Sequence, residues 1–257
     1  MRFTSLGSGS QGNALVVEVG TTRLMLDCGF GVRDTSARLA RVGLDPRDLS
    51  GIVVTHEHSD HGDGVFPLAR RFGVPVWMTW GTFSALRAAD SATGEGFEVN
   101  VIDPHSPFPV GGIEVQPITV PHDAREPVQF AFSDGASRLG VLTDTGSSTP
   151  HIEASLSGCD ALVLECNHDL DMLRKGDYPP SLKARIAGRF GHLDNGVSAA
   201  ILAALDRTRL RHVVAAHLSQ QNNTPELARA ALAGVLGCAP DWVAVATQDE
   251  GLSWRDV

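Results

Sequence analysis

The sequence lacks any apolar run near the length of about 20 residues that a membrane-spanning helix needs. The residues after Met1 form a polar, alternating series without the apolar segment of a signal peptide. The four cysteines lie far apart and show no C-x-x-C spacing, so we expect no disulfide framework. These absences predict a cytoplasmic protein with no membrane partner.

A low-complexity linker and a short-period repeat are also missing from the 257 residues. The 27 glycines and 14 prolines are ordinary numbers for this length, which excludes collagen-like and disordered chains. Hydrophobic residues make up 42% of the chain, enough for a sizeable core. Length alone permits one large domain or two small ones, and without a linker we expect one domain over residues 1–257.

Basic residues are fewer than acidic ones, because the chain has 21 lysines and arginines and 30 aspartates and glutamates. The net charge of −9 argues against broad binding of polyanions, since non-specific affinity for nucleic acid depends on neutralising phosphates. The stretch from Arg174 to Arg189 nevertheless carries five basic side chains. It fits either a solvated helix face or a local basic track, and the sequence leaves both open.

Apolar patterning predicts alternating strands and helices in two halves of similar size. Short β-rich runs predict strands over residues 14–19, 22–27, 51–55, 75–79, 161–165, 212–217, 242–247 and 251–256. Helical patterns cover residues 34–42, 81–90, 181–190 and 195–205, with Asp34 placed to cap the first, and Thr224 and Pro225 open another. This order predicts an α/β (α+β) fold of four layers, with two mixed sheets face to face and helices outside.

The strongest chemical signal is the sequence H-x-H-x-D-H, formed by His56, His58, Asp60 and His61 after a short β-branched run. Residues two apart at the end of a strand point the same way, so His56 and His58 can converge on one ion. Asp60 and His61 come after the chain turns and can address a second position. Imidazole and carboxylate ligands suit divalent ions such as zinc, and also manganese or iron.

Three further side chains of ligand type stand at the ends of apolar runs: His122, Asp144 and His217. Each alone would more often be an ordinary loop residue. Strand ends gather at the edge of a sheet, however, where an active site would collect such side chains. Together with the six-residue motif they favour two metal positions.

These residues and their order resemble the metallo-β-lactamase-fold metallohydrolases, whose pattern is H-x-H-x-D-H followed by a His, an Asp and a final His. The resemblance covers nearly the whole chain and implies an αββα sandwich with a site for two divalent metal ions. It also implies the ligands. One metal is held by His56, His58 and His122, the second by Asp60, His61 and His217, and Asp144 bridges both.

Further motifs resemble the nuclease branches of this superfamily. A bridging carboxylate such as Asp144 is typical of those branches, whereas the antibiotic-hydrolysing lactamases usually have another residue there. G-H-L-D-N at 191–195 and H-L-S at 217–219 resemble tRNase Z and RNase J, while the N-terminal S-L-G-S-G-S-Q-G-N and E-C-N-H-D at 165–169 look most like the single-domain YycJ-type proteins. This implies an exonuclease acting from the 5′ ends of DNA. The chain lacks the inserted domain of RNase J and the long arm of tRNase Z, which disfavours structured RNA.

General metal chemistry assigns roles for phosphodiester hydrolysis. A hydroxide bridging two metals would attack phosphorus. The resemblance to related enzymes implies that Asp60 shares in the orientation of this water. His192 is the candidate to protonate the departing oxygen or to hold the scissile phosphate, and Glu165 would orient it. Three other polar residues are further candidates for substrate contact: Ser8, Asn13 and His168.

Two other functions stay open on the sequence alone. A small-molecule hydrolase, cleaving a thioester, a lactone, a cyclic phosphodiester or, less favoured, a β-lactam, suits the negative net charge. A metal-binding regulatory module is disfavoured by the complete ligand set. The basic stretch and the local motifs favour a nuclease with a nucleic-acid substrate, DNA preferred, and two divalent metal ions, zinc first.

Overall fold

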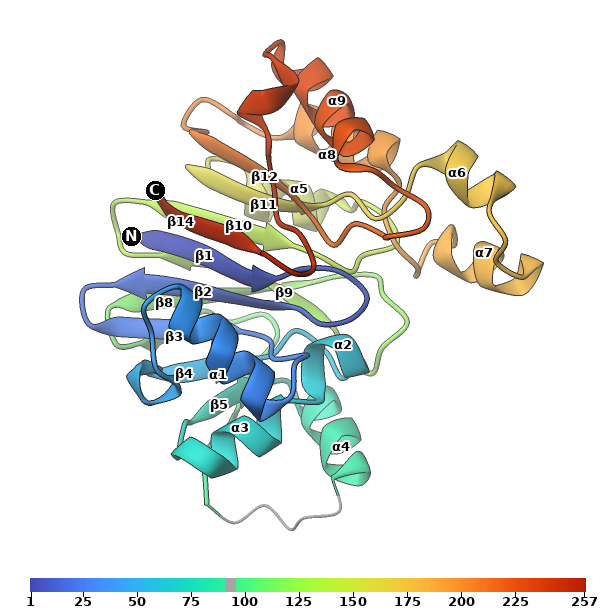
Figure 1. The fold of residues 1–257 in the computed structure, drawn as a ribbon. Helices are drawn as coiled ribbons and strands as arrows, with labels where there is room; N and C mark the ends of the chain where they lie inside the picture. Colours follow the sequence, from blue (N-terminus) through green and yellow to red (C-terminus); the bar gives the residue numbers. More distant parts are fainter. Residues whose placement is uncertain (91–95) are drawn as a thin grey trace.

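The computed structural model describes residues 1–90 and 96–257. Its strands form two seven-stranded mixed sheets that pack face to face, with helices on both outer faces (Figure 1). This is the four-layer α/β arrangement that the sequence predicts. Across these two ranges, the structure contains no helix that is both long and apolar enough to span a bilayer.

The first sheet comes from the N-terminal part of the chain and the final strand. Its order is β14-β1-β2-β3-β4-β5-β6, antiparallel from β14 to β3 and parallel from β3 to β6. Its strands are β1 (Arg2–Gly7), β2 (Ala14–Val19), β3 (Thr22–Leu26), β4 (Gly51–Val53), β5 (Val76–Met78), β6 (Val99–Val101) and β14 (Leu252–Asp256).

The second sheet has the order β13-β12-β11-β10-β9-β8-β7. Its strands are β7 (Phe108–Val110), β8 (Ile113–Thr119), β9 (Val128–Ser133), β10 (Arg138–Leu142), β11 (Ala161–Glu165), β12 (His212–Ala216) and β13 (Ala244–Val245). Because β10, β11 and β12 are parallel neighbours, their carboxyl ends lie side by side. Asp144, Glu165 and His217 stand at or just beyond these ends, at the sheet edge where ligands of α/β proteins commonly bind.

Helices bury apolar side chains against the outer face of each sheet (Figure 1). Those on the first sheet are α1 (Val32–Arg41), α3 (Val65–Phe72) and α4 (Trp80–Ala89), and those on the second are α5 (Pro150–Leu156), α8 (Asn195–Ala204) and α9 (Pro225–Leu236). The remaining helical segments are η1 (Pro46–Asp48), α2 (Ser59–Gly62), α6 (Leu170–Lys175), α7 (Pro180–Ile186) and η2 (Pro240–Trp242). In Figure 1, α6 and α7 project from one edge of the sandwich.

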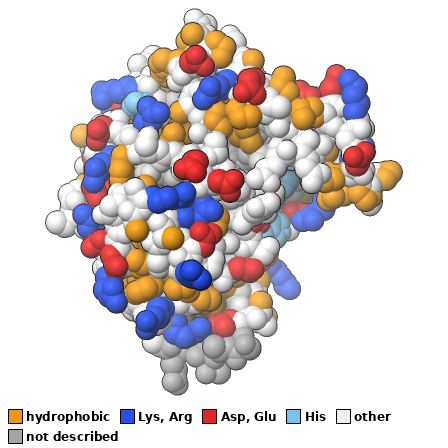
Figure 2. All heavy atoms as spheres, viewed as in Figure 1, with side chains coloured by type: hydrophobic (Ala, Val, Ile, Leu, Met, Phe, Trp, Pro, Cys, Tyr) orange, Lys and Arg blue, Asp and Glu red, His pale blue; other side chains and the backbone are white. Residues whose placement is uncertain are grey.

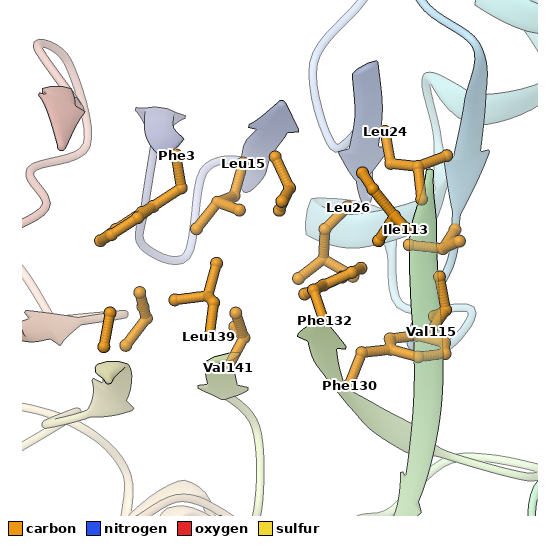
Figure 3. Packing of buried hydrophobic residues seen from close by; sticks show 14 of the residues in the cluster. Phe3, Leu15, Leu24, Leu26, Ile113, Val115, Phe130, Phe132, Leu139 and Val141 are labelled. Carbon is orange, nitrogen blue, oxygen red and sulfur yellow. The ribbon is translucent and has the colours of Figure 1, made fainter. Parts of the chain in front are cut away.

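The central core lies between the two sheets. In Figure 3, Phe3 and Leu15 of the first sheet lie across from Leu139 and Val141 of the second, and Leu26 lies across from Phe132. Alternate residues of β2 join the cluster under the helices instead. Because both faces of the first part of β2 are covered, Ala14 to Val17 are all apolar instead of alternating with polar residues. Packing on both faces fixes the positions of the strand ends that carry the polar residues.

Most predicted elements are present, and the differences have local causes. Thr224 caps α9 and Pro225 is its first residue, as predicted. The prediction for Asp34 is wrong, because α1 already begins at Val32 and Asp34 lies in its first turn. The helix predicted over residues 181–190 ends at Ile186, before a glycine whose flexible backbone disfavours the helical state. The strand predicted over residues 242–247 shortens to β13, because the preceding proline starts the 3-10 turn η2.

Candidate metal centre

The H-x-H-x-D-H motif lies where β4 ends and α2 begins. His56 stands in the extended segment after β4, and His58 occupies the position before the first residue of α2. Asp60 and His61 lie within α2, so the change from strand to helix directs them to a different place from the first two histidines. The motif thus presents its polar side chains from two differently oriented segments.

The second sheet delivers the other three predicted ligands from the ends of β8, β10 and β12: His122, Asp144 and His217. The structure brings all seven predicted ligands together. They fall into overlapping groups in which one ligand atom from each residue lies within 4.8 Å of the others. One group contains His56, His58 and His122, and another contains Asp60, His61 and His217.

Two imidazole nitrogens in the first group face each other, and their partners on the far side indicate the tautomers of the two neutral rings. His122 Nδ1 lies 3.1 Å from the carbonyl oxygen of Gly191, and His58 Nε2 lies 3.2 Å from that of Asp123. A carbonyl oxygen only accepts, so these nitrogens carry the protons of the neutral rings. His122 Nε2 and His58 Nδ1 are then unprotonated, and they lie 3.2 Å apart. A cation between them would relieve the repulsion of the two lone pairs.

His56 presents a third nitrogen of the same kind. Its Nδ1 lies 2.9 Å from Thr55 Oγ1, and the Thr55 hydroxyl donates its only hydrogen to the carboxylate of Asp27 at 2.9 Å. His56 Nδ1 therefore donates to Thr55, and Nε2 of the neutral ring carries no proton. His56 Nε2 is buried without a hydrogen-bond partner. Burial and the neighbouring His61 hold the pKa of His56 well below its usual range, which keeps the ring neutral.

The second group is organised by the same buried carboxylate. Asp27 Oδ2 accepts from His61 Nδ1 at 2.8 Å, which leaves His61 Nε2 directed toward the cluster. The carboxylate of Asp60 lies 3.5 Å from His61 Nε2 and 3.3 Å from His217 Nε2. Hydrogen bonds from ligating histidines to carboxylates or carbonyls are a regular feature of metal sites, because they fix the ring and its tautomer.

Asp144 lies between the two groups. One carboxylate oxygen is 2.7 Å from His61 Nε2, and the other is 3.4 Å from His217 Nδ1. The same side chain also groups with His56 and His61 as a possible ligand set. Asp144 Oδ2 is buried and has no hydrogen bond, although it faces His61 at ion-pair distance. Burial raises the pKa of Asp144, but His217 and His61 outweigh it and hold the pKa well below its usual range.

Strained backbone is confined to this neighbourhood. Among the described residues, only three other than glycine have positive φ angles: Asp27 (59°), Asp144 (52°) and His217 (55°). This left-handed conformation costs about 1–3 kcal/mol for such residues and persists only where surrounding structure enforces it. Its concentration at three residues of one polar cluster is typical of a functional site.

His192 and Glu165 form an ion pair at the inner wall of the cluster. His192 Nδ1 lies 2.8 Å from Glu165 Oε1 and 3.1 Å from Asp144 Oδ1. Glu165 is fully buried, and its second oxygen accepts from the backbone N–H of Thr145. Burial lowers the pKa of His192, but Asp144 and Glu165 raise it well above the usual range. The orientation of His192 by Glu165 thus agrees with the prediction.

A cleft of about 350 Å³ opens over the cluster. Its walls include Asp60, Asp144, His192 and His217, and the segment at α7 adds Arg185. Figure 2 shows pale-blue histidines in the hollow beneath the projecting segment. The basic stretch predicted over residues 174–189 therefore reaches the cleft at one position.

The three additional residues predicted to contact substrate are not among those that line this cleft. Ser8 Oγ accepts from the backbone N–H of His217, and Asn13 Nδ2 lies 3.0 Å from Gly9 O and from His61 Nε2. Both are thus used in holding predicted ligands. His168 is buried, and its backbone carbonyl accepts from the N–H of Asn195 beside the His192 loop. Internal hydrogen bonds hold the side chains of Ser8 and Asn13, and His168 is buried, so contact of these three residues with substrate stays a prediction.

Several cleft residues carried no prediction of their own, among them two beside motifs and two in the projecting segment. Asp123 follows His122 directly, and Asn167 lies inside the E-C-N-H-D sequence. Their proximity to these motifs could have indicated that they belong to the site. Tyr178 and Leu182 come from the projecting segment and have no motif around them. Only the position of α7 over the cleft shows that they belong to the site.

Comparison with known proteins agrees with this architecture. A family model described as a beta-lactamase superfamily domain matches residues 22–218. The chain is 38% identical to exodeoxyribonuclease YycJ of Bacillus anthracis over 238 residues, covering 92% of this chain and 89% of that protein. It is 32% identical to exodeoxyribonuclease WalJ of Streptococcus pneumoniae over 244 residues, covering 93% and 89%.

Among solved structures, the metallo-beta-lactamase fold protein YhfI from Bacillus subtilis superimposes with a TM-score of 0.76. The alignment covers 99% of this chain and 98% of YhfI at 15% identity, so it supports the fold alone. The family model and the two more similar sequences go further, because they cover most of the chain. This chain belongs to the beta-lactamase superfamily, in the group of the YycJ and WalJ proteins.

Proposed function

We propose that this protein is a metal-dependent exonuclease that hydrolyses DNA from the 5′ end. The observation that carries the metal dependence is the meeting of His56, His58 and His122 in one group, with a nitrogen of each ring turned toward the others. The relatives named exodeoxyribonucleases, which match over most of the chain, support the nuclease activity and DNA as the substrate.

The donor set fits two divalent ions, with zinc as the first candidate. His56, His58 and His122 would hold one, Asp60, His61 and His217 the other, and Asp144 reaches both groups. Neutral imidazoles with carboxylates suit zinc, and manganese or iron accept the same ligands. When bound, such ions lower the pKa of a water molecule toward neutrality and offset negative charge on phosphoryl oxygens.

The chain's own residues position the substrate and move protons. His192 donates Nδ1–H to Glu165, so its Nε2 remains for the cleft. The carboxylates of Asp144 and Glu165 favour its protonated form by raising its pKa. In our proposal, His192 gives the Nε2 proton to the departing 3′-oxygen of the scissile phosphodiester. Asp60, in hydrogen-bond reach of His217 at the cleft wall, orients the attacking water.

A small-molecule phosphodiesterase is the second candidate. The cleft volume of about 350 Å³ lies near the lower end for sites that enclose small ligands. The net charge of −9 also suits a substrate with few phosphates. Such an enzyme would cleave small diesters and leave DNA intact.

We also infer one cytoplasmic domain over residues 1–257. Ligand-type residues from both sheets meet in one site, and a common core lies between the sheets. Each of the four cysteines is free, which agrees with a reducing compartment.

Degradation of end-labelled DNA tests the proposed activity directly. With manganese or zinc, we expect stepwise loss of nucleotides from single strands bearing a 5′-phosphate. Asp144→Ala should abolish it, because Asp144 lies within ligand distance of His56 from the first group and of His61 from the second. This variant also controls for contaminating nucleases. Cleavage of bis(p-nitrophenyl) phosphate without cleavage of any DNA would support the small-molecule enzyme instead.

Asp27→Asn should weaken metal binding without removing a ligand. Asp27 fixes His61 directly and His56 through Thr55, and loss of such partners typically lowers metal affinity 10- to 100-fold. Competition with a chelator measures this change. Asp34→Asn, at an exposed carboxylate of α1, is the matched control and should leave affinity unchanged. Equal affinities for Asp27→Asn and the wild type would contradict the proposed organisation of the ligands.

His192→Gln should separate proton donation from metal binding. DNA cleavage should fall about 10²- to 10⁴-fold, the usual contribution of a general acid. Hydrolysis of bis(p-nitrophenyl) phosphate should fall much less, because p-nitrophenolate departs without a proton. Steady-state rates with both substrates, at equal metal content, make the comparison. Equal losses on the two substrates would rule out the acid role.

A further inference from the structure

Two of the most exposed large apolar side chains lie on either side of the loop that carries His122. Trp80, at the start of α4, is 62% exposed, and Phe190, after α7, is 50% exposed. Isolated exposed aromatics are common on protein surfaces and need no explanation. These two differ because backbone hydrogen bonds at Phe190 and next to Trp80 reach the loop that borders the metal centre.

The loop over residues 121–126 joins the two aromatics. The N–H of Gly81, next to Trp80, donates to Glu126 Oε2 at 2.7 Å. At the other end of the loop, the N–H of Asp123 donates to the carbonyl oxygen of Phe190 at 3.0 Å. Asp123 and Glu126 are three residues apart, so they are separated by no more than about 11 Å.

The same loop borders the cluster of histidines. The carbonyl oxygen of Asp123 accepts from His58 Nε2, and its carboxylate is 2.6 Å from Arg185 Nε. Asp123 and Arg185 both line the cleft. The path from Trp80 across the loop to Phe190 is therefore continuous with the cleft wall.

Arginines are interleaved with the aromatics along this path. Arg125 and Arg189 are exposed and have no ion pair among residues 1–90 and 96–257, and Arg189 lies over the Phe190 ring at 5.3 Å. Three carboxylates lie near these arginines, and each has a partner on at least one oxygen. Asp123 pairs with Arg185, and Glu57 and Glu126 accept backbone N–H groups. In Figure 2, Lys and Arg side chains adjoin histidines along this edge.

We propose that Trp80, Arg125, Arg185, Arg189 and Phe190 form a binding track for single-stranded DNA, which we call the aromatic rim. It rests on the proposed nuclease function and deepens it. Proteins hold single strands by stacking bases on aromatic rings and by placing cations along the phosphates, and the rim offers both. The cleft would hold the terminal nucleotides while the rim binds nucleotides farther along the strand.

Steady-state kinetics on a long and a short substrate test the rim. The substrates are a 5′-phosphorylated 20-nucleotide strand of thymidines and the dinucleotide pdTpdT, which is too short to reach past the cleft. Trp80→Ala and Phe190→Ala should each raise KM for the 20-nucleotide strand on the order of tenfold, as expected for a lost base stack. Their kcat values, and all values for pdTpdT, should stay within about twofold.

Two further variants separate stacking from general damage. Trp80→Phe keeps an aromatic face and should restore most of the affinity for the long strand. Trp242→Ala removes a comparably exposed tryptophan (45%) from η2, next to α9, and should change neither substrate's kinetics. An unchanged KM for the long strand, or equal losses on the two substrates, would overturn the rim. A wild-type protein that cleaves neither substrate would instead overturn the proposed function.

Discussion

Three imidazole rings converge in this protein, and hydrogen bonds to their far nitrogens favour the tautomers whose near nitrogens can bind a cation. A carbonyl of Gly191 and one of Asp123 hold the protons of His122 and His58 on their far nitrogens. Thr55 and Asp27 do the same for His56. Without a cation, such an arrangement leaves lone pairs opposed in a poorly solvated place. A metal site explains both the convergence and the hydrogen bonds behind it.

The fold makes this arrangement by joining two sheets at one edge. The first sheet supplies the H-x-H-x-D-H motif after β4, and the second supplies residues from the ends of β8, β10 and β12. The left-handed backbone at Asp27, Asp144 and His217 turns these side chains inward at an energetic cost. The tightly packed core between the sheets stabilises the chain against that cost. Stability of the sandwich and geometry of the site are thus linked.

Local features of the sequence predicted the layers and the seven ligand candidates, because strand patterns and the six-residue motif depend on neighbouring residues. Thr224 and Pro225 likewise predicted the start of α9 correctly. The roles of Ser8 and Asn13 could not be predicted this way. Ser8 accepts from the N–H of His217, 209 residues away, and such pairings arise only when the sheets assemble. The cleft position of Tyr178 depends in the same way on where α7 packs.

Anomalous X-ray scattering from crystals grown with zinc or manganese tests the central claim most directly. The account predicts two peaks about 3.5–4 Å apart, the usual spacing of paired hydrolytic metals. One should lie among His56 Nε2, His58 Nδ1 and His122 Nε2, and the other beside Asp60, His61 and His217, with Asp144 contacting both. No ordered peak at saturating metal, with the three histidines still converging, would contradict the account.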